Sequence, residues 1–290
     1  IDATAISSFK QGDRVFHRKF GYGTVVLSSA SFPQGHRVYG PFYESDDLDA
    51  FDWPRPADVE EVGPQAPALD GWHERGLCSV VRGDNPFKIA GFMRGFDQLL
   101  VDCLERPGFV RELLERIGEV ESARWQAGVR AGARAAMVFG DFADQRSLMI
   151  SPALFRELLV PVLARMVAAV RAIRPEVLAF LHSDGNLTEV LADLVACGFD
   201  AVHPLQPECM DLAEVKRRYA GRLTIFGGLS VQSELPNSRP EEVRALVRAR
   251  IQALGRGGGL ILAPTNSMLP DICDECILAL YEEARRGEAA

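Results

Sequence analysis

The feature that most constrains the fold of this chain is a regular alternation of strand-like and helix-like segments from residue 76 to the end. Short apolar runs predict strands at residues 77–82, 135–140, 177–182, 201–204, 223–227 and 260–263. Helical periodicity predicts helices at residues 109–129, 152–173, 187–197, 212–219, 240–254 and 273–286. Strands that alternate with helices in this way are parallel strands joined by crossover helices. The sequence therefore predicts an α/β barrel or a doubly wound sheet.

Residues 1–75 have a different texture from the rest of the chain. They contain turn signals such as Gly21-Tyr22-Gly23 and Trp53-Pro54, and little periodicity. This indicates an irregular N-terminal segment that carries a hairpin around residues 24–27. An acidic run at residues 44–49 is interpreted as solvated surface. We expect residues 1–290 to form a single barrel domain, with the irregular segment in front of the strand-helix repeats of residues 76–290.

Polar or glycine-rich residues follow nearly every predicted strand, and their distribution separates the two candidate folds. Such clusters occur at residues 82–84, 141–145, 182–184, 206–208, 227–228 and 265–267. A doubly wound sheet concentrates its site at one switch point, whereas a barrel collects side chains from all around one rim. The sequence has no glycine fingerprint for a dinucleotide after the first predicted strand. A barrel is therefore favoured.

Composition excludes some classes of partner. The formal net charge of -8 argues against nucleic acid as the main partner, because phosphate binding needs a basic surface. No apolar run approaches the roughly 20 residues that span a bilayer, and the start of the chain does not resemble a signal peptide. We therefore expect a cytoplasmic protein without a membrane partner, with its six cysteines reduced. They stand at Cys78, Cys103, Cys197, Cys209, Cys273 and Cys276.

The stretch from Phe180 to Asn186 is the strongest candidate for chemistry. It closes a predicted buried strand, and side chains two apart on a strand share one face, so His182 and Asp184 should point the same way. In a barrel this end of the strand is where catalytic residues lie. The alternative is that Asp184 caps the following helix and His182 merely hydrogen-bonds to it.

Several motifs, in this order along the chain, resemble the uroporphyrinogen decarboxylase superfamily. They are residues 48–56, Gly140-Asp141, residues 150–152 and 159–161, His182-Ser183-Asp184-Gly185-Asn186, residues 204–211, residues 226–228 and residues 257–264. The resemblance implies a (β/α)8 barrel with a polar site at the carboxyl ends of its strands. Members are mainly porphyrinogen decarboxylases and zinc-dependent methyltransferases that exchange a methyl group with a corrinoid protein.

Two departures from this family shape the expected function. Members have a helix and a strand before the point that matches Ile1, so the first βα unit is expected to be missing here. If so, residues 1–75 or a partner chain should cover the open seam of the barrel. The arginine-rich substrate motif of the haem-pathway decarboxylases would lie in the missing stretch. Residues 6–9 also offer none of the acid that those enzymes carry. Both points argue against that decarboxylase.

The methyltransferase branch carries a His-x-Cys-Gly motif and a later Cys, which correspond here to His182-x-Asp184-Gly185 and to Asn266. Zinc accepts His and carboxylate ligands as well as thiolates. The resemblance therefore implies a divalent metal, zinc by expectation, on His182 and Asp184. Glu208 or Cys209 from the next segment would supply the third ligand.

Further side chains complete the expected site. Asp141, Asp144 and Gln145 follow a strand and could orient substrate or transfer protons, although a turn with capping acids would explain them equally well. Catalytic roles are assigned to Asp141, Gln145, His182 and Asp184. Substrate binding is assigned to Arg82, His203, Gln206, Glu208 and Asn266, although a lone His beside a Pro is often structural. Cys273 and Cys276 form a CxxC motif, a pattern of redox or zinc chemistry, but their helical surroundings favour ordinary packing.

The expected function is metal-assisted methyl transfer between a small substrate and a corrinoid carried by a partner protein. The first alternative is metal-free decarboxylation of a polycarboxylate or porphyrin precursor, and the second is a binding barrel without chemistry. A homodimer is a further option. If the barrel assignment is correct, the side chains of five residues should converge, namely Asp141, His182, Asp184, Gln206 and Glu208.

Overall fold

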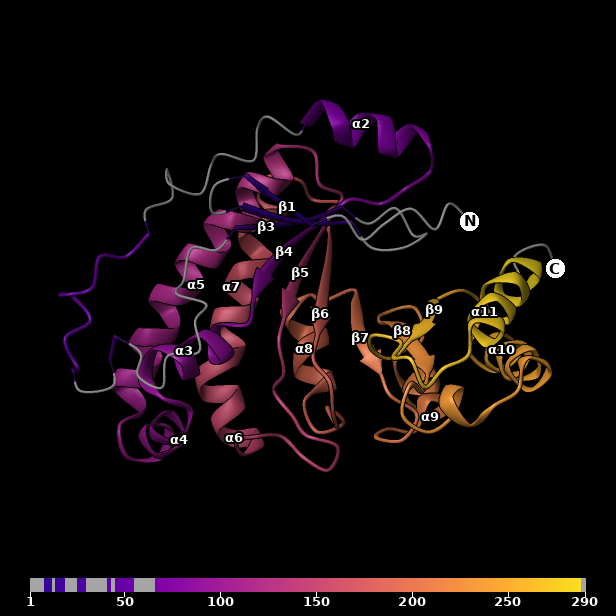
Figure 1. Cartoon of the computed structure of the whole chain (residues 1–290). Helices are drawn as coiled ribbons and strands as arrows, with labels where there is room; N and C mark the ends of the chain where they lie inside the picture. The colour runs from indigo at the N-terminus through magenta and orange to yellow at the C-terminus, as the bar shows by residue number, and fades with distance from the viewer. Residues whose placement is uncertain are drawn as a thin grey trace. The chain divides into compact units, whose positions relative to one another are not determined.

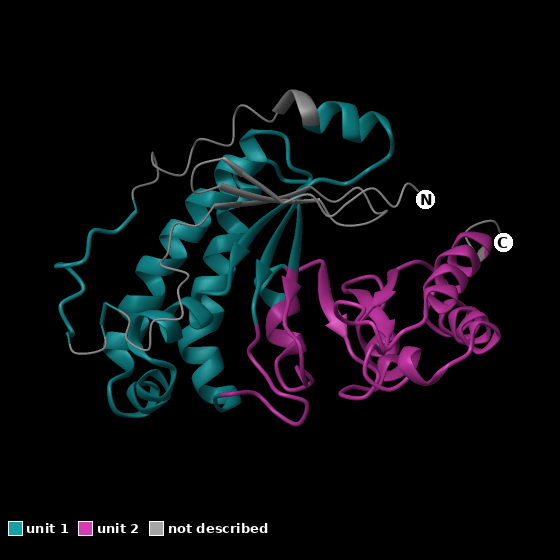
Figure 2. Ribbon diagram, in the orientation of Figure 1, with its two compact units in different colours: residues 1–140, 150–180, 196–198 teal, residues 141–149, 181–195, 199–290 magenta. Residues whose placement is uncertain are grey.

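The computed structural model describes residues 8–11, 14–18, 25–29, 41–42, 45–54 and 66–287. The chain divides into two compact units, which Figure 2 distinguishes by colour. Unit 1 comprises Ile1–Gly140, Ile150–Phe180 and Ala196–Gly198, and unit 2 comprises Asp141–Met149, Leu181–Val195 and Phe199–Ala290. Figure 1 labels the elements of both units.

The sheet of unit 1 begins with antiparallel strands and continues with parallel ones. β1 (Ser8–Gln11), β2 (Arg14–Arg18) and β3 (Val25–Ser29) pair antiparallel in chain order, so the hairpin predicted around residues 24–27 is confirmed. β3 then pairs in parallel with β4 (Val80–Asp84), which pairs in parallel with β5 (Ala135–Phe139). A strand of the N-terminal segment thus covers the edge of β4, as expected for a missing first βα unit. The missing unit itself stays a prediction.

Several helices lie in the described part of unit 1. They are α2 (Ala66–Glu74), α3 (Pro86–Arg94), α4 (Phe96–Glu105), α5 (Pro107–Arg130), α7 (Val160–Arg171), and the short α6 (Pro152–Leu154), which leads into the π-helical turn η2 (Phe155–Leu159). The predicted helix at residues 109–129 is α5, and that at 152–173 is α6, η2 and α7 together. The sequence analysis did not predict α2, α3 or α4. α3 has a clear start, because the Asn85 side chain accepts a hydrogen bond from the Phe87 N–H and Pro86 occupies the first turn.

A buried polar cluster of unit 1 lies at the carboxyl end of β4. The Glu121 side chain of α5 is fully buried, and its Oε2 accepts a hydrogen bond from the Asp84 N–H at 2.9 Å. Arg124 lies 3.1 Å from the other Glu121 oxygen. Glycine at position 83 leaves room for the Glu121 side chain, since a Cβ there would lie 2.5 Å from Glu121 Oε2. Burial raises the pKa of Glu121 to about 7; Arg124 opposes this shift and Asp84 adds to it.

Unit 2 continues the alternation of strands and helices. Its strands are the end of β6 (Leu178–His182), then β7 (Ala201–Leu205), β8 (Thr224–Leu229) and β9 (Leu260–Pro264), and the last three pair in parallel. Its helices are α8 (Leu191–Cys197), α9 (Leu212–Tyr219), the 3-10 turn η3 (Leu235–Asn237), α10 (Pro240–Leu254) and α11 (Asp274–Gly287). The predicted strands and helices from residue 177 on are therefore confirmed, with ends displaced by at most a few residues.

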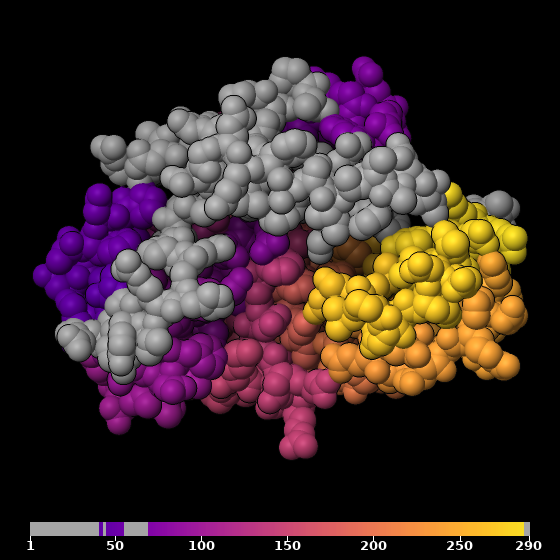
Figure 3. Space-filling model, viewed as in Figure 1, coloured from indigo at the N-terminus to yellow at the C-terminus, as the bar shows by residue number. Residues whose placement is uncertain are grey.

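α10 and α11 pack side by side in unit 2, as the cartoon and the space-filling view both show (Figures 1 and 3). Between them lies an apolar cluster of Leu229, Leu235, Val243, Val247, Ile272, Cys276, Ala279 and Leu280. Cys276 is bonded to Cys273, and their Cα atoms are 5.2 Å apart. The expectation that all six cysteines are reduced is therefore wrong for these two. The expected packing role of Cys276 is confirmed.

Among the described residues, no helix combines the length and the apolar character needed to cross a membrane.

Candidate functional site

Three polar side chains of unit 2 form the centre of the candidate site. His182 is the last residue of β6, Asp184 follows it by two positions, and Asp141 lies two positions after the end of β5. The Nε2 atom of His182 is 4.0 Å from an oxygen of Asp141 and 4.0 Å from Oδ1 of Asp184. The backbone N–H of Asp184 donates a hydrogen bond to Asp141 Oδ1 at 2.9 Å. The imidazole thus faces two carboxylates that the backbone holds beside one another.

The second ring nitrogen of His182 contacts another imidazole. Its Nδ1 is 2.8 Å from Nδ1 of His203 in β7, so one of the two atoms donates and the other accepts. The rings are stacked with centroids 5.0 Å apart, and Phe226 packs edge-on against His203. The Ser183 N–H also donates to the His203 carbonyl at 2.8 Å. These contacts fix the orientation of the buried His182 ring.

The two oxygens of Asp184 have different surroundings. Oδ2 accepts a hydrogen bond from Asn266 Nδ2 at 2.6 Å. Oδ1 is buried and has no hydrogen-bond partner within the described part of the chain. Burial raises the pKa of Asp184 to about 6; Asp141 and Glu208 add to the rise, whereas the Asn266 hydrogen bond opposes it. A buried carboxylate oxygen without a partner indicates that a proton or a cation belongs there.

The turn after Asp184 requires a glycine and leads into a hydrogen-bonded network. Gly185 has φ of +93°, and a Cβ at this position would lie 2.3 Å from the Asp144 carbonyl oxygen. The Gly185 N–H donates to Gln206 Oε1 at 2.6 Å, and Gln206 donates to Glu208 Oε1 at 3.4 Å. The hydroxyl of Ser230 donates to the same Glu208 oxygen at 3.1 Å. These bonds tie the ends of β6, β7 and β8 together.

Ser230 is a member of this network that the sequence analysis missed. It directly follows β8, and the other side chains of the site follow strands in the same way. Its position directly after a strand is the sequence signal by which Ser230 could have been predicted as a site residue.

Asp144 and Gln145 lie outside the central group. One Asp144 oxygen accepts hydrogen bonds from the Arg146 and Ser147 N–H groups, which lower the pKa of Asp144 and close a turn. This confirms the turn interpretation for Asp144. Gln145 is exposed, and its amide donates to Gln232. Its catalytic role stays a prediction.

A metal ion would find three ligand atoms in one place. One atom each of Asp141, His182 and Asp184 lies within 4.8 Å of the other two, and within the described residues this is the one such group of three. Glu208 and Cys209, expected as third ligands, are not part of it. Glu208 instead accepts the hydrogen bonds described above. Burial raises the pKa of the Cys209 thiol, and the charge of Glu208 raises it further.

Arg82 belongs to β4 in unit 1. Its guanidinium carbon is 3.5 Å from the ring centroid of Phe139, and one of its nitrogens is 3.9 Å from Asp84. Burial lowers the pKa of Arg82, and Asp84 opposes this shift. Its role in substrate binding stays a prediction. Asn266 is placed in the site by its bond to Asp184, and His203 by its contact with His182.

Comparisons with known proteins place these observations in a family. The family described as uroporphyrinogen decarboxylase (URO-D) matches residues 43–287. A uroporphyrinogen decarboxylase from Chlorobaculum tepidum is 26% identical over 63% of this chain and 50% of its own length. The methylcobamide:CoM methyltransferase MtaA from Methanosarcina barkeri is 24% identical over 76% of this chain and 58% of its own length. The chain therefore spans little more than half the length of these curated relatives.

The fold is shared with a solved methyltransferase from Methanosarcina mazei. The TM-score is 0.68 at 18% identity, over 90% of this chain and 71% of that one. This likeness confirms the expected α/β fold of the barrel type. Because the family match covers most of the sequence, the chain belongs to the uroporphyrinogen decarboxylase family.

Proposed function

We propose that this chain is a metal-dependent methyltransferase that acts with a corrinoid carried by a partner protein. The observation that carries the proposal is the buried Asp184 Oδ1, which lacks a hydrogen-bond partner in the described residues and faces the Nε2 edge of His182 beside Asp141. The relative named methylcobamide:CoM methyltransferase supports methyl transfer that involves a corrinoid.

The donor set fits a divalent metal. Two carboxylates and one imidazole supply the three protein ligands that catalytic zinc sites use, and they suit harder divalent ions as well. Asp141, His182 and Asp184 would hold the ion. When bound, the ion would supply Lewis-acid polarisation of an oxygen or sulfur on the small substrate. A donor set without thiolate is harder than the His-Cys motif of the methyltransferase branch, so Mn²⁺ or Fe²⁺ would compete with zinc here.

The surrounding side chains have positioning roles in this proposal. His203 holds Nδ1 of His182, which directs Nε2 toward the two carboxylates. Asn266 holds one oxygen of Asp184 and leaves the other turned toward His182. Gln206 fixes the backbone at Gly185 directly after them. Partners of ligand groups set ligand orientation in metal sites, so all three would affect metal affinity without binding the ion.

Decarboxylation is the second candidate, and it uses the same carboxylate differently. The pKa of Asp184 is raised to about 6, so part of the population is protonated near neutral pH. A protonated Asp184 could deliver its proton to the carbon from which carbon dioxide leaves. The relatives named uroporphyrinogen decarboxylase support this alternative.

Metal content and activity of two Asp184 variants separate the candidates. If Asp184 is a ligand, Asp184→Cys keeps an anionic ligand and should retain or tighten zinc, whereas Asp184→Asn removes the charge and should weaken it. If Asp184 acts through hydrogen bonds, Asn should be the milder change in zinc content and in activity. If Asp184 instead delivers the proton of decarboxylation, Asp184→Asn should lose that activity without a change in metal content.

Asp144→Asn is the matched control, because the amide oxygen can still accept the turn hydrogen bonds. The assays are zinc stoichiometry after dialysis, methyl transfer from free methylcobalamin to CoM, and release of carbon dioxide from a porphyrin precursor. If Asp184→Asn retains as much metal as the unaltered protein, the metal mechanism is wrong. If neither a metal nor either activity is found, the chain is a binding barrel.

A further inference from the structure

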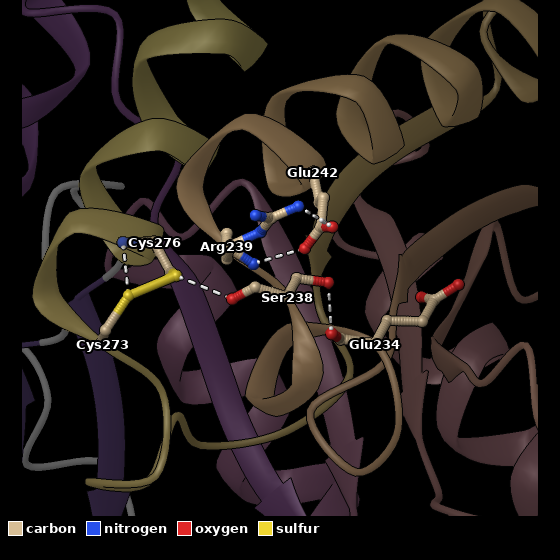
Figure 4. Close-up of a disulfide and its surroundings, with 6 residues drawn as sticks. All are labelled: Glu234, Ser238, Arg239, Glu242, Cys273 and Cys276. Carbon is tan, nitrogen blue, oxygen red and sulfur yellow. Dashed lines mark hydrogen bonds and ion pairs between the residues drawn. A yellow bond between two sulfur atoms is a disulfide. The ribbon is translucent and has the colours of Figure 1, made fainter.

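The CxxC motif of the last helix is a paired site that the proposed function does not use. Cys273 directly precedes α11, Cys276 lies in its first turn, and the two sulfurs are bonded (Figure 4). Cys273 is exposed, whereas Cys276 is 1% exposed and packs in the apolar cluster between α10 and α11. An incoming thiol can therefore approach one sulfur of the pair and not the other.

The surroundings of the two sulfurs differ in a way that assigns their roles. The Cys276 N–H points at Cys273 Sγ over 3.2 Å, and the N-terminus of a 14-residue helix favours negative charge at that position. The adjacent acids Asp274 and Glu275 oppose this effect. Cys276 Sγ is 3.2 Å from the carbonyl oxygen of Ser238, which can accept a thiol proton. After reduction, Cys273 is thus favoured as thiolate and Cys276 as neutral thiol.

The acceptor for Cys276 is held in place by the start of α10. The Ser238 hydroxyl donates to the Glu234 carbonyl at 2.7 Å. The next residue, Arg239, is fixed by its N–H bond to Glu242 at 2.8 Å (Figure 4). The cysteine pair is not a candidate metal site. In the described residues, the group of three potential metal ligands does not include Cys273 or Cys276. Two cysteines alone do not complete a zinc site.

We propose that Cys273 and Cys276 form a thiol–disulfide exchange site whose partner is a low-molecular-weight thiol or a protein dithiol. The partner thiolate attacks Cys273 Sγ and breaks the bond between the two cysteines. Cys276 leaves and takes up the proton that the partner thiol released. A second partner thiol then attacks the mixed disulfide, frees Cys273 and forms the partner's own disulfide. Two electrons thereby pass from two thiols to the cysteine pair; one of the two thiol protons goes to Cys276 and the other to solvent, which leaves Cys273 as thiolate.

The test is redox equilibration of the full chain followed by mass spectrometry. Protein is held in buffers of different ratios of reduced to oxidised dithiothreitol, and free thiols are alkylated before digestion. We expect the peptide with both cysteines to pass from unlabelled to doubly labelled as the ratio rises. The buried Cys103 and Cys197 serve as internal controls that stay reduced throughout. Free thiols at both positions in the most oxidising buffer would overturn the proposal.

Two single variants test the assigned roles. Exposed to oxidised glutathione, Cys276→Ala should form a mixed disulfide on Cys273 about tenfold or more faster than Cys273→Ala forms one on Cys276, because rate follows thiolate character and access. Circular dichroism verifies that both variants fold, and Cys276→Ser replaces the alanine variant if the apolar cluster does not tolerate the truncation. Equal rates in the two variants, or a faster reaction at Cys276, would overturn the assignment.

Discussion

Glu121 offers a direct test of how burial controls protonation in this chain. The carboxyl group is fully buried in unit 1, accepts a hydrogen bond from the Asp84 N–H and lies beside Arg124. The perturbation is Glu121→Gln. Glutamine has nearly the same shape, can accept the same backbone hydrogen bond and cannot ionise. It therefore removes the titration and leaves most of the packing.

The magnitude follows from the raised pKa. Glu121 has a pKa of about 7 in the folded chain, against an ordinary value of 4.5 for a solvated glutamate in the unfolded chain. Between these values the folded chain keeps a proton that the unfolded chain has released, so stability falls as pH rises and levels off above pH 7. A difference of about 2.5 pH units at 1.36 kcal/mol each gives a loss of about 3 kcal/mol.

The assay is urea unfolding from pH 5 to pH 8, followed by tryptophan fluorescence. We expect Glu121→Gln to match the unaltered chain near pH 5 and to exceed its stability at pH 8 by about 3 kcal/mol. Glu119→Gln, an exposed position on the same helix, is the control and should leave the pH dependence unchanged. The quantity to compare is the stability of Glu121→Gln minus that of the unaltered chain. If this difference is smaller at pH 8 than at pH 5, the reasoning is refuted.

Three further changes have defined outcomes. Gly185→Ala places a Cβ within 2.3 Å of a backbone carbonyl oxygen at a residue with positive φ. Urea unfolding should therefore show a loss of about 1–3 kcal/mol in the free energy of unfolding. An unchanged midpoint would contradict the turn geometry. Asp102→Ala removes the 2.6 Å partner of buried Arg94, which keeps its ion pair with Asp46, so the same measurement should show a loss of about 1–3 kcal/mol. Asn266→Ala removes a hydrogen bond that lowers the pKa of Asp184, so carboxyl NMR of metal-free protein should show that pKa above about 6; an unshifted titration would mean that the bond is not made.

The sequence predicted the strands from residue 177 on because each is a short apolar run bounded by glycine, proline or polar residues. The helices before α5 were not predicted, because residues that usually mark turns lie within or between these helices. Pro86 and Gly95 are turn signals in isolation, yet Pro86 begins α3 and Gly95 separates α3 from α4 by a single residue. α2 follows residues 55–65, which lie outside the described part of the chain, so its start cannot be compared with its sequence.

The meeting of His182, Asp184 and Asp141 could be predicted because all three lie at the carboxyl ends of neighbouring strands. Which carboxylate becomes the third member could not. Asp141 and Glu208 both follow a strand within a few residues, and the choice between them depends on the path of each loop. Ser230 and Gln206 engage Glu208, whereas the Asp184 N–H draws Asp141 toward His182. The Cys273–Cys276 bond likewise depends on a backbone approach that residue spacing alone does not determine.

The contact between the two imidazoles has a consequence for proton counting. A single proton lies between Nδ1 of His182 and Nδ1 of His203, so the two rings cannot both be fully protonated while the contact persists. A lone pair on His182 Nε2, which a metal would need, requires that this proton reside on His182. Neutral His203 must then carry its own proton on Nε2. Metal binding at one ring would therefore select the tautomer of the other, and a change in the tautomer of His203 would be visible in its nitrogen NMR shifts.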